Sequence, residues 1–157
     1  MPNRKPQRQS AARVRTLLLP MARKEASALI LRTRLNLERL RSGETDRSLI
    51  THLLQICLVT AFVTRAGYGQ LAIDQLDRVG RELGELLVEL DETGSCEYGE
   101  TLMEGITPVV NEYDCMLGAV RLEIFAGASD YLDRLMVGAA NEESPFTNPR
   151  RNSESPR

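Results

Sequence analysis

The sequence predicts an all-α protein, a bundle of four or five helices that run antiparallel where their connections are short. Apolar residues recur at steps of three and four along most of the chain, which is the spacing of one face of an α-helix. Aromatic residues are scarce, with three Phe, four Tyr and no Trp. Leu, Ile, Val and Ala must therefore fill the core, as they do in helical bundles.

One domain is expected for a chain of 157 residues, and it is predicted to span residues 11–139. Residues 1–10, MPNRKPQRQS, predict a disordered basic arm, because they contain prolines and basic residues but almost no apolar side chains. Residues 140–157 predict a disordered tail, which has three prolines and little apolar content.

The first helices follow from their apolar faces and their stop signals. Residues 11–19 predict a short helix with Ser10 as its N-cap, and Pro20 ends or bends it. Residues 22–41 predict the first long helix, with Gly43 as its C-terminal stop. The arc that this helix is expected to bury consists of Ala26, Leu29, Ile30, Thr33, Leu37 and Leu40.

The 22–41 helix has a second, smaller apolar patch that points away from this arc. It consists of Ala28, Leu31 and Leu35. An apolar patch of this kind needs a cover, which is either the 11–19 segment or another chain. Leu31 and Leu35 are therefore candidate self-association residues. The arginines that border the main arc stand where long side chains pair with the acids of a neighbouring helix.

Residues 46–66 predict the central helix of the domain, closed at its end by Gly67. Its second half, residues 56–63 (ICLVTAFV), is apolar nearly all round, which is typical of the most enclosed helix of a domain. A strand is the rival interpretation of this short run, but no turn signal separates the run from the helix before it. The run alone is too short to span a bilayer.

Residues 70–92 predict a third long helix, followed by a loop at 91–99. Gly80 and Gly84 lie four residues apart on it, and because each Gly costs about 1 kcal/mol relative to Ala in a helix, they predict the close approach of another backbone. Residues of opposite charge at i,i+4 predict three ion pairs on the solvent-exposed face of this helix, each of which stabilises the helix by about 0.2–0.5 kcal/mol. These pairs are Asp74–Arg78, Asp77–Arg81 and Arg81–Glu85.

The last long helix is predicted at 107–137, after a short helix from about residue 100, because Thr107 and Pro108 suggest either a new helix start or a kink. It is expected to end at Gly138. Its apolar residues recur at near-heptad spacing, and this stripe either packs within the bundle or forms a seam with a second copy of the chain. The candidate self-association residues on it are Val110, Tyr113, Leu117, Val120 and Ile124.

Charge divides the chain into two parts. Residues 1–41 hold eleven Lys or Arg and two acids, whereas residues 42–157 hold nine basic and twenty acidic residues. The basic part either pairs with the acidic part or meets an acidic partner. The first fifteen residues of the chain contain no acid, so the basic arm and the residues just after it are suited to binding nucleic-acid phosphates, with little preference for nucleotide sequence. The candidate nucleic-acid contacts are Arg4, Lys5, Arg8, Arg13 and Arg15.

No catalytic or metal-binding motif stands out in the sequence, and no cofactor is predicted. The only His is His52, and Leu49 stands where a Glu-x-x-His motif would place its carboxylate, so a His at the solvent edge of its helix is expected. The three cysteines, Cys57, Cys96 and Cys115, form no CxxC motif, and an odd number without a secretory signal predicts a reducing cytoplasm. Cys96 is expected to be an ordinary surface thiol whose pKa the neighbouring acids raise.

The stretch at 35–69, LNLERLRSGETDRSLITHLLQICLVTAFVTRAGYG, resembles short helical proteins of proteobacteria that carry the label of Fis-like transcriptional regulators. The similarity lies in the spacing of Leu, Arg and Gly over about a fifth of the chain. The label implies DNA binding through a basic recognition helix near the C-terminus. Here the last long helix has Arg121 and Arg134 among five acids, so the resemblance assigns no DNA-contacting residue.

These patterns predict a non-catalytic cytoplasmic interaction protein that self-associates and carries a basic arm for nucleic acid. The expected partners are a second copy or another protein, then nucleic acid, with no insertion into a membrane. The arm has alternative roles as a solubilising tail or as a contact for an acidic protein or membrane surface. The main alternative function is a DNA-binding transcriptional regulator that reads a groove with the 22–41 helix, and an enzyme is the third.

Overall fold

The computed structural model describes residues 13–142, with side chains as far as residue 138. Within this range the chain forms helices and no strand, apart from an isolated bridge between Pro20 and Arg121. The predicted all-α class is confirmed. After a helical turn at 13–17, the elements are α2 (Arg23–Arg41), α3 (Arg47–Val63), the π-helical turn η1 (Thr64–Tyr68), α4 (Ile73–Thr93), α5 (Glu100–Ala119) and α6 (Leu122–Glu142).

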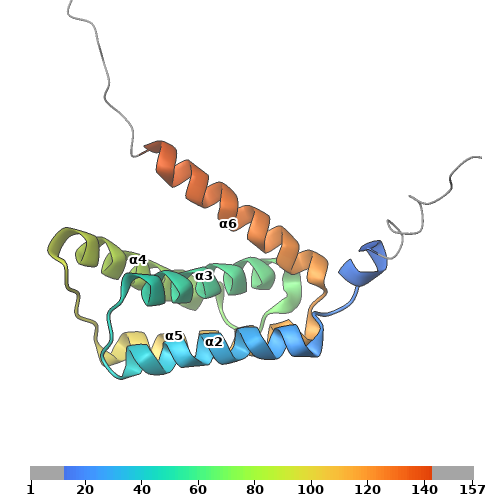
Figure 1. Cartoon of the computed structure of the whole chain (residues 1–157), viewed down its shortest axis with the longest axis horizontal. Helices are drawn as coiled ribbons and strands as arrows, with labels where there is room; N and C mark the ends of the chain where they lie inside the picture. The colour runs from blue at the N-terminus through green and yellow to red at the C-terminus, as the bar shows by residue number, and fades with distance from the viewer. Residues whose placement is uncertain (1–12, 143–157) are drawn as a thin grey trace, which may run out of the picture.

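Helices α2 to α5 form the body of the molecule, in two layers. One layer pairs α2 with α5, and the other pairs α3 with α4 (Figure 1). Because α3 contacts α2, α4, α5 and α6, it is the central helix that the sequence predicts. Helix α6 starts at one end of the body and slants away from it, and its main contact is with α3 (Figure 1).

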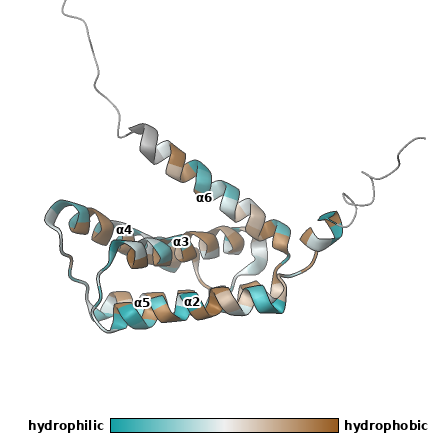
Figure 2. Ribbon diagram, viewed as in Figure 1, coloured by the Kyte–Doolittle hydropathy of each residue, from teal (hydrophilic) through white to brown (hydrophobic). Residues whose placement is uncertain are grey.

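Two clusters of buried apolar side chains make up the core. The larger joins α2, α3, α4 and α5, and its fully enclosed members include Leu40, Ile50 and Leu83. The smaller lies where α6 begins and includes Val63, Leu117 and Phe125. Figure 2 shows the apolar residues alternating with polar ones along each helix of the body, as amphipathic helices require. The predicted arc of α2 faces inward, with only Leu29 and Ile30 half buried.

Glycines in the left-handed conformation follow three of the helical segments. Gly43, at φ 93°, lies just after α2, and Gly67, at φ 96°, lies within η1 at the end of the α3 segment. Both stops are predicted by the sequence. The third is Gly94, at φ 78°, whose N–H donates to the Leu90 carbonyl at the end of α4. A residue without Cβ adopts this conformation at no steric cost.

The single helix predicted at 107–137 is wrong, because the structure divides it into two. Helix α5 already starts at Glu100 and passes through Pro108, and it ends at Ala119. Val120 is extended, at ψ 141°, and the N–H of Leu122 donates to the Leu19 carbonyl, at 2.8 Å, before α6 begins. Helix α6 also continues beyond Gly138, to Glu142. The predicted disordered tail at 140–157 is therefore wrong for residues 140–142, which belong to α6. The rest of that tail and the predicted arm at 1–10 lie outside the described residues.

The glycines of α4 do not mark a close backbone approach. A Cβ on Gly84 would meet no atom within 4 Å, and one on Gly80 would make an ordinary 3.7 Å contact with the Cys57 sulfur. Among the helical glycines, the tight position is instead Gly105 of α5, where a Cβ would lie 2.9 Å from the side-chain atom Cγ2 of Val79. The three predicted ion pairs along α4 are not found among the ion pairs of residues 13–138. Asp77 pairs with Arg65 of η1 instead, at 2.7 Å.

The described part of the 11–19 segment, residues 13–19, does not cover the second apolar patch of α2. Leu31 and Leu35 remain 60% and 55% exposed, because the turn at 13–17 lies beyond the end of the body (Figure 1). By length and mean hydropathy, the segment Arg47–Tyr68 could cross a membrane, and a central helix packed inside a helical protein has the same properties.

Candidate interaction surfaces

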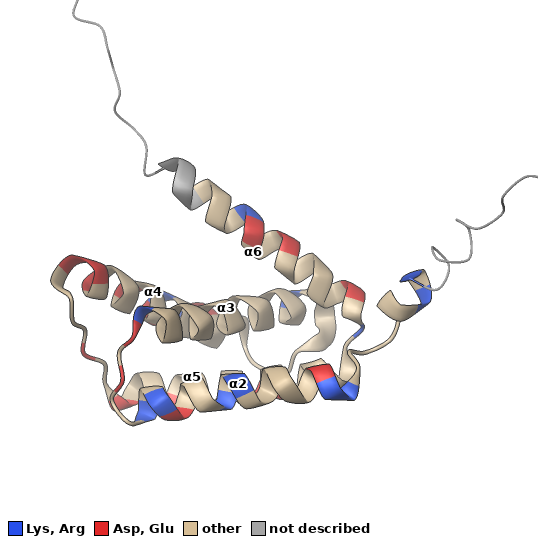
Figure 3. Cartoon of the chain, in the orientation of Figure 1, with Lys and Arg blue, Asp and Glu red and all other residues tan. Residues whose placement is uncertain are grey.

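The structure describes only part of the predicted nucleic-acid arm. Arg13 and Arg15 lie in the helical turn at 13–17, and both are exposed. This turn projects from the corner where α6 begins, and Figure 3 shows that it carries basic residues. Arg4, Lys5 and Arg8 lie outside the described residues. The turn therefore presents positive charge away from the body of the molecule.

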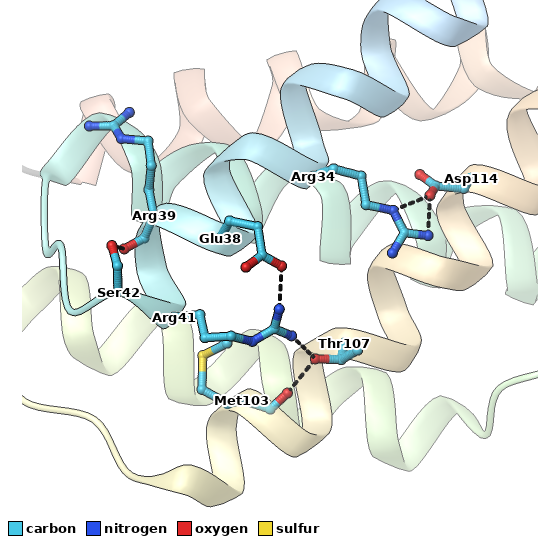
Figure 4. Close-up of polar contacts among 8 residues, drawn as sticks. All are labelled: Arg34, Glu38, Arg39, Arg41, Ser42, Met103, Thr107 and Asp114. Carbon is cyan, nitrogen blue, oxygen red and sulfur yellow. Dashed lines mark hydrogen bonds and ion pairs between the residues drawn. The ribbon is translucent and has the colours of Figure 1, made fainter.

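Most arginines in the second half of α2 are already paired inside the molecule. Arg34 binds Asp114 of α5 at 2.6 Å, which confirms pairing between the basic helix and an acidic neighbour (Figure 4). Arg41 pairs with Glu38 on its own helix and donates to the Thr107 hydroxyl of α5. Arg39 binds Glu44 in the following loop, at 2.7 Å.

The carboxylate of Asp114 is the least exposed acid among these pairs, with a side chain that is 13% exposed. Burial raises the pKa of Asp114, and the hydrogen bond and the charge of Arg34 act in the opposite direction. The pair joins α2 to α5 through Nε and Nη2 of Arg34, which both reach Oδ2 (Figure 4). Its role is structural, because it holds the two helices of one layer together.

A hollow of about 520 Å³ lies beside the N-terminal half of α3, and His52 is on its wall. His52 is half buried, and its Nε2 lies 3.3 Å from the Thr33 hydroxyl, which itself donates to the Leu29 carbonyl. Burial lowers the pKa of His52, and the nearby charge of Arg32 lowers it further. The imidazole is therefore neutral at pH 7, and its contact with Thr33 links α3 to α2.

The three cysteines are free thiols, and two of them are buried. Cys57 donates to the Leu76 carbonyl at 3.3 Å, and burial raises its pKa to about 12. Cys96 is buried, so the predicted surface thiol is wrong; its pKa is nevertheless raised, first by burial and then by Glu89. The exposed thiol is Cys115. Residues 13–138 contain no group of three or more metal-ligating side chains.

An acidic hollow of about 390 Å³ lies between α4 and the start of α5. Its wall combines four carboxylates with the ring of Tyr98 and two leucines. Figure 3 shows acidic residues at this end of α4 and along the following loop. The carboxylates that line the hollow are Glu82, Glu85, Glu89 and Glu97.

The residues predicted for a seam between copies divide into two groups. Val110, Tyr113, Leu117 and Val120 are at most 6% exposed inside the chain's own core, so they are not surface residues, and Ile124 is half buried. Leu31 and Leu35 are exposed, as a contact with another chain requires. The near-heptad spacing therefore reflects packing within the chain.

Sequence reasoning missed two exposed apolar segments. One is the N-terminal segment, where Val14, Leu17, Leu18 and Leu19 are 37% to 60% exposed. The other is the end of α6, where Leu135, Met136 and Val137 are 42% to 62% exposed. Apolar residues on both segments are visible in the sequence, but only the structure shows that no helix of the body covers them (Figure 2).

In comparisons with known proteins, no family model, no curated protein and no solved structure matches this chain. The resemblance of residues 35–69 to Fis-like regulators therefore stays a prediction from the sequence.

Proposed function

We propose that this chain is a non-catalytic interaction protein that self-associates through exposed apolar side chains and contacts nucleic acid with its basic N-terminal arm. One observation carries the proposal. Eleven large apolar side chains are exposed in the described part of the chain, and nine of them lie on three short segments: 14–19, the outer face of α2 and the end of α6. Apolar surface gathered in this way marks an interface.

The proposed protein is a bundle of four or five helices located in the cytoplasm. Helices α2 to α5 supply the body, and α6 is the fifth helix, attached through Phe125 and its neighbours. The three free cysteines support a reducing compartment.

The nucleic-acid part of the proposal depends on charge. The arm holds five basic residues and no acid in its first fifteen positions, and the two that the structure describes are exposed. Its contacts with phosphate would release counterions, so binding should weaken steeply with salt. For three to five phosphate contacts on duplex DNA, the slope of log K against log salt is about −3 to −4.5.

The regulator that reads a groove with α2 is the competing function. Arg32 supports it, because this exposed residue makes no ion pair within residues 13–138. However, Arg34, Arg39 and Arg41 already bind acids within the chain, and a groove contact would have to displace those acids. The arm is therefore the favoured contact.

A DNA-binding titration of three variants separates the two functions. Loss of binding on removal of residues 1–15, without preference among DNA sequences, supports the arm. Loss on the double substitution Arg32→Ala and Arg39→Ala, with binding intact after the truncation, supports the regulator. The matched control is Arg78→Ala with Arg81→Ala, which removes the same charge from exposed positions of α4. No binding to any nucleic acid at low salt rejects both functions and leaves a protein partner.

A further inference from the structure

The two exposed apolar segments that the sequence does not reveal leave the body at the same corner. The N–H of Leu122 donates to the Leu19 carbonyl at 2.8 Å, and Pro20 forms a bridge with Arg121. From this junction the turn at 13–17 and helix α6 point in different directions (Figure 1). The two segments therefore begin together and do not meet again within one chain.

The apolar stripe of α6 extends beyond the part of the helix that packs against the body. Phe125 and Ala128 are buried against the body, at 7% and 0% exposure. Leu132 and Leu135 continue the same face at steps of four and three, and Leu135 is 42% exposed, with Met136 beside it at 59%. Leu132 is half buried and Leu135 is exposed, so the end of this stripe is largely uncovered within residues 13–138.

The N-terminal segment carries side chains that match this uncovered stripe. Val14 and Leu18 are 57% and 47% exposed, and they lie four residues apart on one side of the turn. An isolated turn of this length is not stable by itself in water, so it needs a surface on which to pack. The uncovered end of α6 offers an apolar surface of the same kind.

Charge is complementary between the two segments. Arg13 and Arg15 flank the apolar side chains of the N-terminal segment, whereas Asp130 and Asp133 lie beside the stripe of α6. All four are exposed, and none of them takes part in an ion pair within residues 13–138. Figure 3 shows basic residues on the N-terminal segment, and acidic residues together with the basic Arg134 on α6.

We propose that two copies of the chain exchange these segments, so that residues 13–19 of each copy pack along the uncovered stripe of α6 in the other. This inference rests on the proposed self-association and identifies its surface. Because each copy gives one segment and accepts one, a two-fold axis closes the pair and leaves neither segment exposed. Arg13 and Arg15 then face acids of the partner, and Arg4, Lys5 and Arg8 remain for nucleic acid.

Sedimentation equilibrium of the full-length chain tests the exchange. One variant carries Leu17→Asp with Leu18→Asp, and the other carries Leu135→Asp with Met136→Asp. All four positions are exposed within one chain, so the fold should persist, which far-UV circular dichroism checks. We expect a dimer for the natural sequence and a weakening of association by at least tenfold in either variant. Val88→Asp, at an exposed position of α4, is the matched control and should leave the dimer intact.

Mixing the two variants tests whether the contact is reciprocal. The first variant keeps an intact α6, and the second keeps an intact N-terminal segment, so a mixed pair has one of the two contacts. We expect the mixture to form a heterodimer at concentrations where each variant alone is monomeric. A mixture that stays monomeric overturns the exchange.

The remaining outcomes separate this inference from the proposed function. A natural sequence that is monomeric up to high concentration rejects self-association and the exchange together. A dimer that survives both variants, or that is lost in only one of them, overturns the exchange and leaves self-association standing. In that case Leu31→Asp with Leu35→Asp, which lie on the exposed patch of α2, should abolish the dimer.

Discussion

Among the glycines inside the α-helices, Gly105 is the one with the least room for a side chain. A methyl group there would lie 2.9 Å from Cγ2 of Val79, a buried β-branched residue that has few ways to move aside. We expect Gly105→Ala to lower the free energy of unfolding by about 1–3 kcal/mol, because α4 and α5 must separate slightly.

Gly118, on the same helix, is the matched control for this substitution. A Cβ there would meet no atom within 4 Å, so Gly118→Ala should stabilise the protein by up to about 1 kcal/mol through helix propensity. Urea titration of both variants measures the two effects. Equal effects in the two variants would show that the contact with Val79 does not limit the packing.

His52 should make the stability of the protein depend on pH just below neutrality. The folded pKa of His52 is lowered from 6.5, first by burial and then by Arg32. Well above pH 6.5 the imidazole is neutral in both the folded and the unfolded state, so its burial does not reduce stability there. As the pH falls through 6.5, the unfolded chain takes up the proton first, and the free energy of unfolding decreases until the folded pKa is reached.

Urea unfolding at pH 7.5 and pH 5.5 measures this dependence. We expect the natural sequence to lose more stability on acidification than His52→Gln, since Gln does not titrate and the carboxyl groups are common to both proteins. His52 is the only His in the sequence, which makes the difference between the two proteins specific to it. The same loss in both would contradict the inferred burial of the imidazole.

At the scale of the elements, α2 and α5 are joined by the ion pair between Arg34 and Asp114, in which only the carboxylate of Asp114 is largely buried. Removing the guanidinium with Arg34→Ala would leave the poorly exposed carboxylate of Asp114 without a partner, and its pKa would rise further. We expect a loss of about 1–2 kcal/mol at pH 7, which is reduced because Arg34 is itself 45% exposed.

Acidification should relieve this loss, because Asp114 is then protonated and needs no partner. Adding Asp114→Asn should relieve it at pH 7 as well. A double-mutant cycle, measured by urea unfolding at pH 7 and again at pH 4, tests both statements. A cycle without coupling at pH 7 would show that the pair does not hold the layer together.

Helix α6 has two halves that should respond differently to substitution. Phe125 is 7% exposed and packs edge-to-face on Tyr113, with ring centroids 6.5 Å apart, so Phe125→Ala should cost about 3–4 kcal/mol. Leu135→Ala should change the stability of one chain by less than about 0.5 kcal/mol, because its side chain has little protein around it. Thermal unfolding of dilute protein compares the two. Similar costs would mean that the second half of α6 is covered within one chain.

At the scale of the whole molecule, stability should decrease from α3 outward. Helix α3 contacts α2, α4, α5 and α6, and side chains such as Ile50 and Leu53 are fully enclosed. Amide hydrogen exchange in dilute protein should therefore be slowest in α3 and fast both in the turn at 13–17 and in α6 beyond Leu132, where local opening breaks few contacts. Rapid exchange throughout α3 would contradict its central place.

The sequence predicts the body of the fold well because periodicity is a local property. The bounds of α2, the buried arc on it and the stops at Gly43 and Gly67 all follow from residues within the same helix. The break between α5 and α6 could not be predicted in this way, since it depends on a hydrogen bond from Leu122 to Leu19, which is distant in the sequence. The near-heptad spacing of apolar residues continues across this break, so the sequence pattern shows no sign that one helix ends there and another begins.

The surfaces were harder to predict than the helices, because exposure depends on what the neighbours cover. The patch at Leu31 and Leu35 follows from the helical period alone. By contrast, the spacing of Val110 and Leu117 predicts a contact between two copies, but α2 and α3 enclose both side chains. Cys96 is predicted to be an exposed thiol because it lies in a loop, but the body buries it. Spacing shows which residues share a face, but it does not show what that face meets.

The contact between Leu19 and Leu122 brings together two regions from opposite ends of the sequence. Residues 19 and 122 are therefore anchored at one corner of the body, although 102 other residues lie between them in the sequence. Spin labels placed close to these two residues should consequently stay at a fixed separation for as long as this corner remains folded.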